Sequence, residues 1–189
     1  MEELETRTLL AASALFLGGE LQILTDADED VIVRANPNST TSVQVLVNNT
    51  PLVNLPGLTT AQVTSLLIVT GDESNDVNLG GVTLLAFPNL TSIVVDTGNG
   101  DDSIIGSPDW PDSIDAGDGK DTINGQGGDD ILNAGDGDDS ILGGAGDDSI
   151  DANDGNDFVN GEAGDDTILA GDGNDNVLGG TGDDSITNS

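Results

Sequence analysis

Apolar residues recur at every ninth position along the second half of the chain. From Ala116 to Thr187 the sequence divides into eight consecutive nine-residue units, and the eighth position of each unit is Ile, Leu or Val. The fourth position is always Gly and the sixth is always Asp. Aliphatic residues in constant register with Gly and Asp predict a stack of short strands joined by acidic turns.

A longer period overlies the first. Position 3 is Asp in alternate units and another residue in the units between them, so the true period is 18 residues. This period is expected if alternate turns stack on opposite sides of a two-sheet roll. The turns on one side then hold two acidic side chains each, whereas those on the other side depend more on main-chain carbonyls. The position-5 acids are interpreted as a solvated face rather than as ligands.

Two further units precede the uninterrupted array. TGNGDDSII occupies residues 97–105, and a degenerate unit, SPDWPDSID, follows after Gly106, which we interpret as one extra residue. Both units keep the phase of the 18-residue period.

Residues 20–96 contain apolar, β-branched stretches without exact repetition. Clusters of Asn, Pro, Gly and Asp separate them. Three segments, 20–33, 65–79 and 92–105, share a strand, an acidic turn ending in Asp (Asp30, Asp76 and Asp102) and a second apolar step. We interpret this region as wider, irregular coils of the same solenoid. The predicted strands are 21–24, 31–33, 43–47, 63–69 and 93–95.

Charge then narrows the set of functions. The chain has 36 acidic residues, 3 basic residues and a net charge of −33, with no His, Cys or Tyr. The absence of Cys and His removes disulfides, thiolate nucleophiles, zinc–thiolate sites and His-based catalysis. Three cations cannot neutralise a row of phosphates, so neither nucleic acid nor an anionic membrane is an expected partner. The partner that this charge implies is a cation.

Composition also divides the chain. Residues 97–189 hold 24 acids and 21 of the 27 Gly, whereas residues 1–96 hold 12 acids. Residues 1–19 form a third region with an apolar stretch too short to span a bilayer as a helix. This region resembles the Glu-rich leader of some bacterial surface proteins with such repeats, and an amphipathic helix capping the first coil is the alternative. The expected organisation is therefore a leader or cap at 1–19, irregular solenoid at 20–96 and repeats at 97–189.

The nonapeptide closely resembles the G-G-x-G-x-D-x-U-x repeat of the repeats-in-toxin (RTX) family, in which U is a large aliphatic residue. The resemblance implies an all-β, right-handed parallel β-roll in which the first six residues of a unit bind calcium and the last three form a strand. It makes the position-6 Asp the invariant ligand, and the two-acid turns add the position-3 Asp. The expected metal ligands are Asp102, Asp118, Asp121, Asp130, Asp136, Asp139, Asp148, Asp154, Asp157, Asp166, Asp172, Asp175 and Asp184.

Elementary chemistry agrees with calcium. Carboxylates and carbonyls without N or S ligands suit a hard cation, and Ca²⁺ accepts six to eight oxygens in irregular geometry. Equivalent Asp residues 18 apart would stack at roughly 4.8 Å and repel one another. We therefore expect folding of the roll to depend on calcium, with six or more ions bound. In residues 20–96, calcium at Asp26, Asp28, Asp30, Asp72 and Asp76 and ordinary polar turns are both open readings.

The predicted function is calcium binding by a secreted, extracellular β-roll module with a structural or adhesive role. The alternative is a C-terminal secretion and folding module of a larger enzyme or toxin. A calcium-assisted polysaccharide lyase is disfavoured, because the chain offers only Arg7, Arg34 and Lys120 as cationic bases and has no Tyr. We therefore expect no enzymatic activity. The repeat array reaches Thr187, so we also expect fraying of residues 179–189, or end-to-end self-association.

Overall fold

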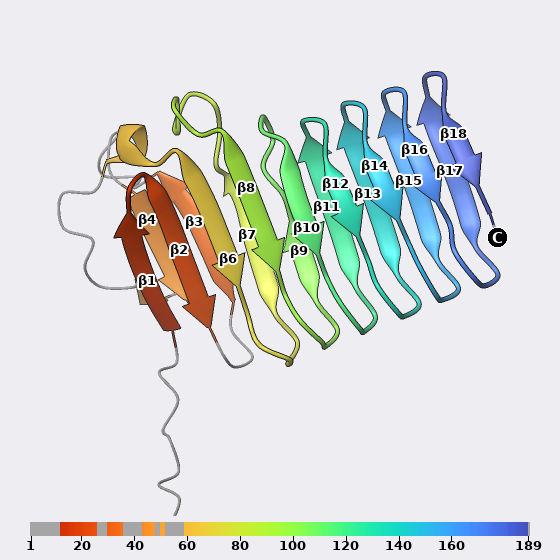
Figure 1. The fold of residues 1–189 in the computed structure, drawn as a ribbon, viewed down its shortest axis with the longest axis horizontal. Helices are drawn as coiled ribbons and strands as arrows, with labels where there is room; N and C mark the ends of the chain where they lie inside the picture. The colour runs from red at the N-terminus through yellow and green to blue at the C-terminus, as the bar shows by residue number, and fades with distance from the viewer. Residues whose placement is uncertain (1–11, 26–29, 36–42, 48–49, 52–58, 189) are drawn as a thin grey trace, which may run out of the picture.

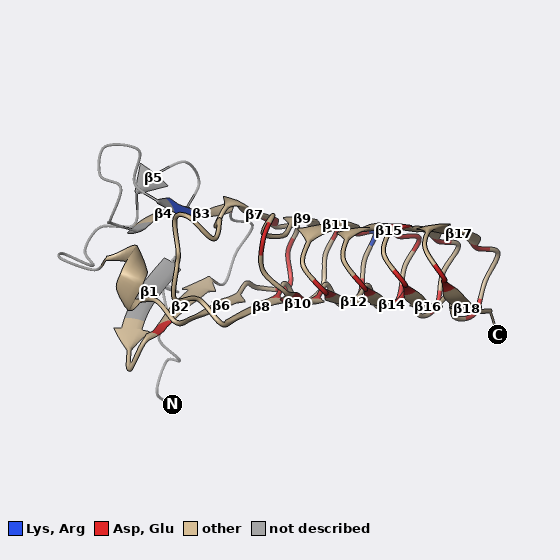
Figure 2. Cartoon of the chain, turned by 90° about the horizontal axis from the view of Figure 1, so that it is seen from above, with Lys and Arg blue, Asp and Glu red and all other residues tan. Residues whose placement is uncertain are grey.

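Two β-sheets lie face to face along the long axis of the molecule (Figures 1 and 2). The structure is a computed structural model, and it describes residues 12–25, 30–35, 43–47, 50–51 and 59–188. Within these described residues each sheet has nine strands, and after β6 consecutive strands alternate between the two sheets. The chain thus winds from one sheet to the other through turns at the two edges.

The strands of sheet A are, in spatial order, β1 (Ala12–Leu17), β2 (Glu20–Thr25), β6 (Ser65–Val69), β8 (Ser92–Asp96), β10 (Asp112–Asp115), β12 (Ile131–Asn133), β14 (Ser149–Asp151), β16 (Thr167–Leu169) and β18 (Ser185–Thr187). The strands of sheet B are, from the opposite end, β17 (Asn176–Thr181), β15 (Phe158–Ala163), β13 (Ser140–Ala145), β11 (Thr122–Gly127), β9 (Ser103–Ile105), β7 (Asp76–Gly81), β3 (Val31–Ala35), β4 (Val43–Val47) and β5 (Thr50–Pro51). The described residues also include a 3-10 turn at Thr60–Gln62.

Successive coils shorten along the chain, as the partners in sheet A show. The coils take 45, 27, 19 and then 18 residues, from the pairs Leu21–Leu66, Leu66–Ile93, Ile93–Asp112 and Ile114–Leu132. Pairing between neighbouring coils is parallel throughout, and the 18-residue register continues to β18. The expected parallel β-roll with wider, irregular coils before it is therefore confirmed.

The N-terminal ends of both sheets are antiparallel. β1 pairs antiparallel with β2, and on sheet B β4 pairs antiparallel with β3. The alternative of a capping helix is therefore wrong for residues 12–17, which form an edge strand. Gly18 and Gly19 have φ of 63° and 102°, the positive values that a two-residue hairpin turn needs, so the chain reverses into a hairpin there.

The interior changes along the molecule. Early strands bury two apolar residues each, such as Ile93 and Val95 in β8. The strands from β9 to β16 bury a single large aliphatic residue each, and these residues come from position 8 of the nonapeptide. In sheet A the pairing of neighbouring strands explains why the second apolar residue is lost. Ile93 in β8 pairs with Asp112 in β10, and Asp130 occupies the same position in the following coil. Acidic side chains thus take the place of an apolar column.

Two details of the expected alignment are corrected. Asp76 pairs with Ser103, so the residue equivalent to Asp102 is Asn75 and not Asp76. Gly106 continues the strand register opposite Gly125, and the extra residue of the degenerate unit lies in the turn that follows. The sequence alone did not give either detail, because the turns differ in length from coil to coil. Residues of different coils are equivalent when they pair between strands, and that pairing cannot be read from the sequence of a turn.

The last coil is more exposed than the middle of the roll. Ile186 is 47 % exposed, whereas Ile150 is 1 % exposed. Fraying of residues 179–189 stays a prediction, as does self-association. In the part of the chain that the structure describes, no helix has the length and hydrophobicity needed to cross a membrane.

Candidate metal sites

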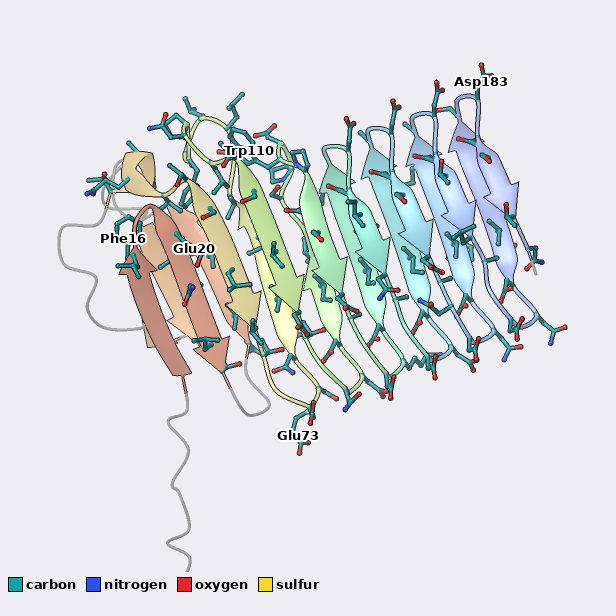
Figure 3. The ribbon with its side chains drawn as sticks, in the orientation of Figure 1. Phe16, Glu20, Glu73, Trp110 and Asp183 are labelled. Carbon is teal, nitrogen blue, oxygen red and sulfur yellow. The ribbon has the colours of Figure 1, made fainter. Side chains whose placement is uncertain are left out.

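Acidic turns stack in two series along the opposite edges of the sheets, at the top and the bottom of the view in Figure 3. Series 1 leads into sheet B and contains the position-6 residues Asp102, Asp121, Asp139, Asp157 and Asp175. Series 2 leads into sheet A and contains Asp112, Asp130, Asp148, Asp166 and Asp184. In Figure 3, Glu73 marks the edge of series 1, and Trp110 and Asp183 mark the edge of series 2.

Position-6 carboxylates lie inside the molecule although they are acids. From Asp102 to Asp166, every position-6 Asp is at most 3 % exposed, and only Asp175 and Asp184 in the last coil are more open. Burying a charged group is costly unless it is paired with an opposite charge or hydrogen bonded. The contacts of the two carboxylate oxygens therefore decide what these residues do.

One oxygen of each carboxylate ties neighbouring coils together. The Oδ1 atom of Asp139 accepts the main-chain N–H of Asp121 at 2.7 Å, and Asp148 accepts that of Asp130 at 2.9 Å. The same bond recurs at every step of both series with lengths between 2.7 and 3.1 Å. Each position-6 Asp except Asp112 thus accepts a hydrogen bond from the coil before it, which fixes the orientation of its carboxylate.

The second oxygen of the same carboxylates is buried and has no hydrogen-bond partner. Such atoms are rare in native proteins because a buried, unsatisfied polar atom costs about 1–3 kcal/mol, and more when it is charged. Here they repeat along both series, and a bound cation is the simplest partner for all of them. The atoms are Oδ2 of Asp102, Asp121, Asp130, Asp139, Asp148, Asp157, Asp166 and Asp175, and Oδ1 of Asp112.

Asp112 is the position-6 residue that sequence reasoning missed. It is 2 % exposed, and its Oδ2 accepts the main-chain N–H of Ser107 at 2.6 Å. Its other oxygen has no partner, as in the regular repeats. The signal that could have found it is the Asp-Ser-Ile ending of SPDWPDSID, which matches the ends of the regular units although the Gly residues of the turn are missing.

Glycine keeps the space beside the unpartnered oxygens open in series 2. A Cβ atom placed on Gly143 would lie 2.5 Å from Oδ2 of Asp148 and 2.8 Å from the carbonyl oxygen of Gly161. Gly125 and Gly161 have the same surroundings in their own coils. A carboxylate oxygen and a main-chain carbonyl oxygen therefore border one small space that only Gly at position 1 leaves free.

Burial also changes the ionisation of these acids. Desolvation raises the pKa of Asp121 and Asp112 to about 7 and that of Asp130 to about 8, well above the ordinary value of an Asp. Desolvation raises the pKa of Asp139 and Asp148 to about 6. Neighbouring carboxylates add to the shift in the regular repeats. Without a cation, these acids of the folded roll therefore keep their protons to a higher pH than an ordinary Asp does.

The position-5 acids have a different role. Asp147 accepts the main-chain N–H of Asp165 at 2.9 Å, so its hydrogen bond points to the following coil and not to the preceding one. Asp129 and Asp138 make equivalent bonds, and all three side chains are exposed. Their exposure fits the expected solvated face. Their hydrogen bonds, which the sequence did not predict, also link neighbouring coils.

The position-3 acids Asp118, Asp136, Asp154 and Asp172 are exposed on the turns of series 1. Among the described residues, no three acidic side chains come together at one point that could hold a metal ion. A cation site in these turns must therefore use main-chain carbonyl oxygens beside the carboxylates. The role of the position-3 side chains as ligands stays a prediction.

In residues 20–96 the acids of the turns are not arranged like those of the roll. Asp72 and Asp76 are exposed, and Asp30 is half-buried. Asp26 and Asp28 lie outside the described residues. Calcium binding by these acids stays untested.

The donors in the roll are all oxygens, are partly anionic and are repeated in register. Hard cations that tolerate irregular, many-oxygen coordination match this donor set, and Ca²⁺ is the biological ion with these properties. The fold and the sites together define a calcium-binding parallel β-roll.

Comparison with protein families gives the same assignment. Four copies of the RTX calcium-binding nonapeptide repeat match, at residues 111–141, 125–159, 133–168 and 151–186. Residues 111–186 therefore consist of RTX calcium-binding repeats, as the resemblance implied. No curated protein and no solved structure matches the chain.

Proposed function

We propose that this chain is an extracellular structural or adhesive module whose roll folds when calcium binds between successive turns. The observation that carries the proposal is the repeated, buried carboxylate oxygen without a partner. The carboxylate that carries each such atom is already held by a main-chain N–H group on its other oxygen, so a cation and not another donor from the protein would complete the site.

The residues that would hold the ions are the position-6 acids together with turn carbonyls, and in series 1 also the position-3 acids. When bound, calcium supplies positive charge to carboxylates that otherwise repel along the stack. Asp121, Asp139 and Asp157 present their second oxygens to successive turns of one series. An ion between two turns would therefore link adjacent coils as well as neutralise them.

The number of ions follows from the number of intervals between turns. The regular units give three intervals in each series, which is the basis for six ions. Asp102 and Asp112 carry the same unpartnered oxygen and extend each series by one interval, which allows eight. We therefore propose six to eight ions per chain.

An extracellular role is supported by the affinity expected of such sites. Calcium modules that work outside cells bind at roughly 10⁻⁴–10⁻³ M, a concentration that the cytosol does not reach. A structural or adhesive role is supported by the absence of His, Cys and Tyr from the sequence, which removes catalysis based on imidazole, thiolate or phenol groups.

Far-UV circular dichroism through a calcium titration tests coupled folding. The chain in chelator should lack most of the β signal of residues 116–187 and should gain it cooperatively at roughly 10⁻⁴–10⁻³ M calcium. Magnesium at the same concentration is the control and should substitute poorly, because it demands regular octahedral geometry. A β spectrum that is unchanged in excess chelator would contradict the proposal.

Native mass spectrometry tests the ion count. Six to eight calcium ions should remain bound to the folded chain. Asp112→Asn should reduce a count of eight by one and leave a count of six unchanged. Two or fewer ions would contradict the assignment of a site to each interval.

A further inference from the structure

The turn that precedes the first acid of series 1 is closed by an amide. Asn75 is the residue equivalent to Asp102 in the preceding coil, and it is 2 % exposed. Its Nδ2 donates hydrogen bonds to the carbonyl oxygens of Gly71, at 3.0 Å, and of Glu73. Two turn carbonyls thus receive N–H donors from the side chain at position 6.

A carboxylate in the same place could not make these bonds. An ionised Asp only accepts hydrogen bonds, whereas an Asn amide has two N–H donors. In the next coil Oδ2 of Asp102 is buried without a hydrogen-bond partner, and the proposed function places a cation there. In the turn of Asn75 the amide N–H groups already provide positive partial charge to the carbonyls.

We infer that the Asn75 amide takes the place of a metal ion, so that the coil of residues 65–96 folds without calcium and templates the calcium-dependent roll. The inference rests on the proposed function, because it defines where the calcium-dependent turns begin. In this inference the calcium sites of series 1 begin after the turn of Asn75.

The other edge of the same coil has the same character. In sheet A, Leu66 and Ile93 occupy the column that continues as Asp112, and both are at most 2 % exposed. Among the described residues before Asp102, no Asp or Glu is buried. Neither edge of this coil therefore buries a negative charge that would oppose folding in the absence of metal.

Contact between the two kinds of turn is direct. The main-chain N–H of Asn75 donates to Oδ1 of Asp102 at 2.7 Å, and the N–H of Asp102 donates to Asp121 at 2.7 Å. The turn that is closed by the amide therefore presents the first N–H group that orients a metal-binding carboxylate. Each turn orients the carboxylate of the next turn in this way. We therefore expect the roll to fold coil by coil from residues 65–96 toward β18.

Hydrogen exchange with mass spectrometry tests the inference on the full chain. In wild-type protein, peptides from 65–79 should be equally protected in calcium and in chelator, whereas peptides from 134–151 should lose protection in chelator. Asn75→Asp removes the donors and adds a carboxylate. It should lose protection of 65–79 in chelator, regain it in calcium and bind one additional ion by native mass spectrometry.

Asp121→Asn is the matched control, since it makes the reverse exchange at the equivalent position two coils later. It should bind one ion fewer and leave the protection of 65–79 in chelator unchanged. Wild-type peptides from 65–79 that exchange in chelator as fast as those from 134–151 would overturn the inference, as would an Asn75→Asp chain that keeps wild-type protection in chelator.

The two proposals fail in different ways. A wild-type chain that binds no calcium in residues 116–187 contradicts the proposed function. A chain that binds calcium there but leaves 65–79 unprotected in chelator contradicts only the inference about Asn75. The wild-type comparison needs no variant, so it decides the matter even where Asn75→Asp does not refold.

Discussion

The coils before Asp96 and the coils after Ala116 share one strand order but fill their interiors differently. In β6, Leu66 and Ile68 both face the core and are at most 2 % exposed. In β14 only Ile150 does so, and Asp148 lies where the second apolar residue would be. The solenoid therefore exchanges apolar burial for buried carboxylates in its later coils, and the proposed function places the partners of these carboxylates as cations.

The exchange alters what stability depends on. Burial of apolar surface contributes roughly 25 cal/mol per Å² in any buffer, so the first coils need no ligand. A buried carboxylate with one unpartnered oxygen is unfavourable without a positive partner, so under the proposed function the stability of the roll depends on calcium. The comparison predicts that the chain has two regions, one that is stable without calcium and one that is stable only with calcium.

Acidity should have the largest effect, and only in the roll. Burial raises the pKa of Asp130 to about 8 and those of Asp112 and Asp121 to about 7, whereas an unfolded Asp titrates near 3.9. A raised folded-state pKa means that the protonated roll is stabilised at low pH and loses this stability as pH rises through about 6 to 8.

In chelator, the β signal of the roll should therefore be stronger at pH 5 than at pH 8. In limiting calcium the trend should reverse, because protons compete with the ion for the same oxygens. Circular dichroism at both pH values measures the effect. The control is the protection of residues 65–69 against hydrogen exchange, corrected for the intrinsic exchange rate at each pH, which should not change. A metal-free signal that is independent of pH would contradict the role of these carboxylates.

Removal of one buried carboxylate should have the next largest effect. Asp148→Asn replaces a carboxylate oxygen by an N–H group facing a cation, and loss of one partner of a buried charged pair costs about 3–5 kcal/mol. The matched control is Asp147→Asn, which keeps the oxygen that accepts the N–H of Asp165. Calcium titration should show a strongly raised midpoint for the first variant and little change for the second. Equal midpoints would place the ligand elsewhere.

Truncation of one core residue in each region distinguishes them directly. Ile68 and Ile141 are both 0 % exposed, and Ile→Ala at such positions costs about 2–5 kcal/mol. Ile68→Ala should lower the free energy of unfolding of the first coils in chelator as well as in calcium. Ile141→Ala should change nothing in chelator and should raise the calcium midpoint of the roll. Denaturant unfolding that shows the same loss for both variants in chelator would break the comparison.

Backbone strain inside the roll should have the smallest effect. Glu162 has φ of 72° where the equivalent Gly144 and Gly180 have 120° and 109°, and Asn160 accepts its N–H at 3.2 Å. Glu162→Gly relieves the left-handed strain and should stabilise the calcium-loaded roll by at most about 1 kcal/mol. Thermal unfolding in calcium measures it, with Asn160→Ala as a control that should be destabilising. A destabilised Glu162→Gly chain would show that the Glu side chain contributes more than the strain costs.

Repetition made most of the roll predictable from the sequence. Every nonapeptide places Gly, Asp and an aliphatic residue at the same positions, so strands, turns, the 18-residue period and the position-6 acids could be read without coordinates. The strands of residues 20–96 could also be read, because β-branched clusters between turn residues identify strands wherever they lie.

Outside the repeats, only the tertiary structure shows which residues of neighbouring coils occupy the same position. Pairing of Asp76 with Ser103 makes Asn75 the counterpart of Asp102, and pairing of Ile93 with Asp112 identifies the missed acid. The hydrogen bonds that orient one oxygen of each carboxylate and leave the other without a partner join residues in neighbouring coils, 18 residues apart in the regular repeats. Local sequence determines which residues form a turn. Only packing of one coil on the next determines which of their atoms meet, because that contact is made between residues that the sequence keeps apart.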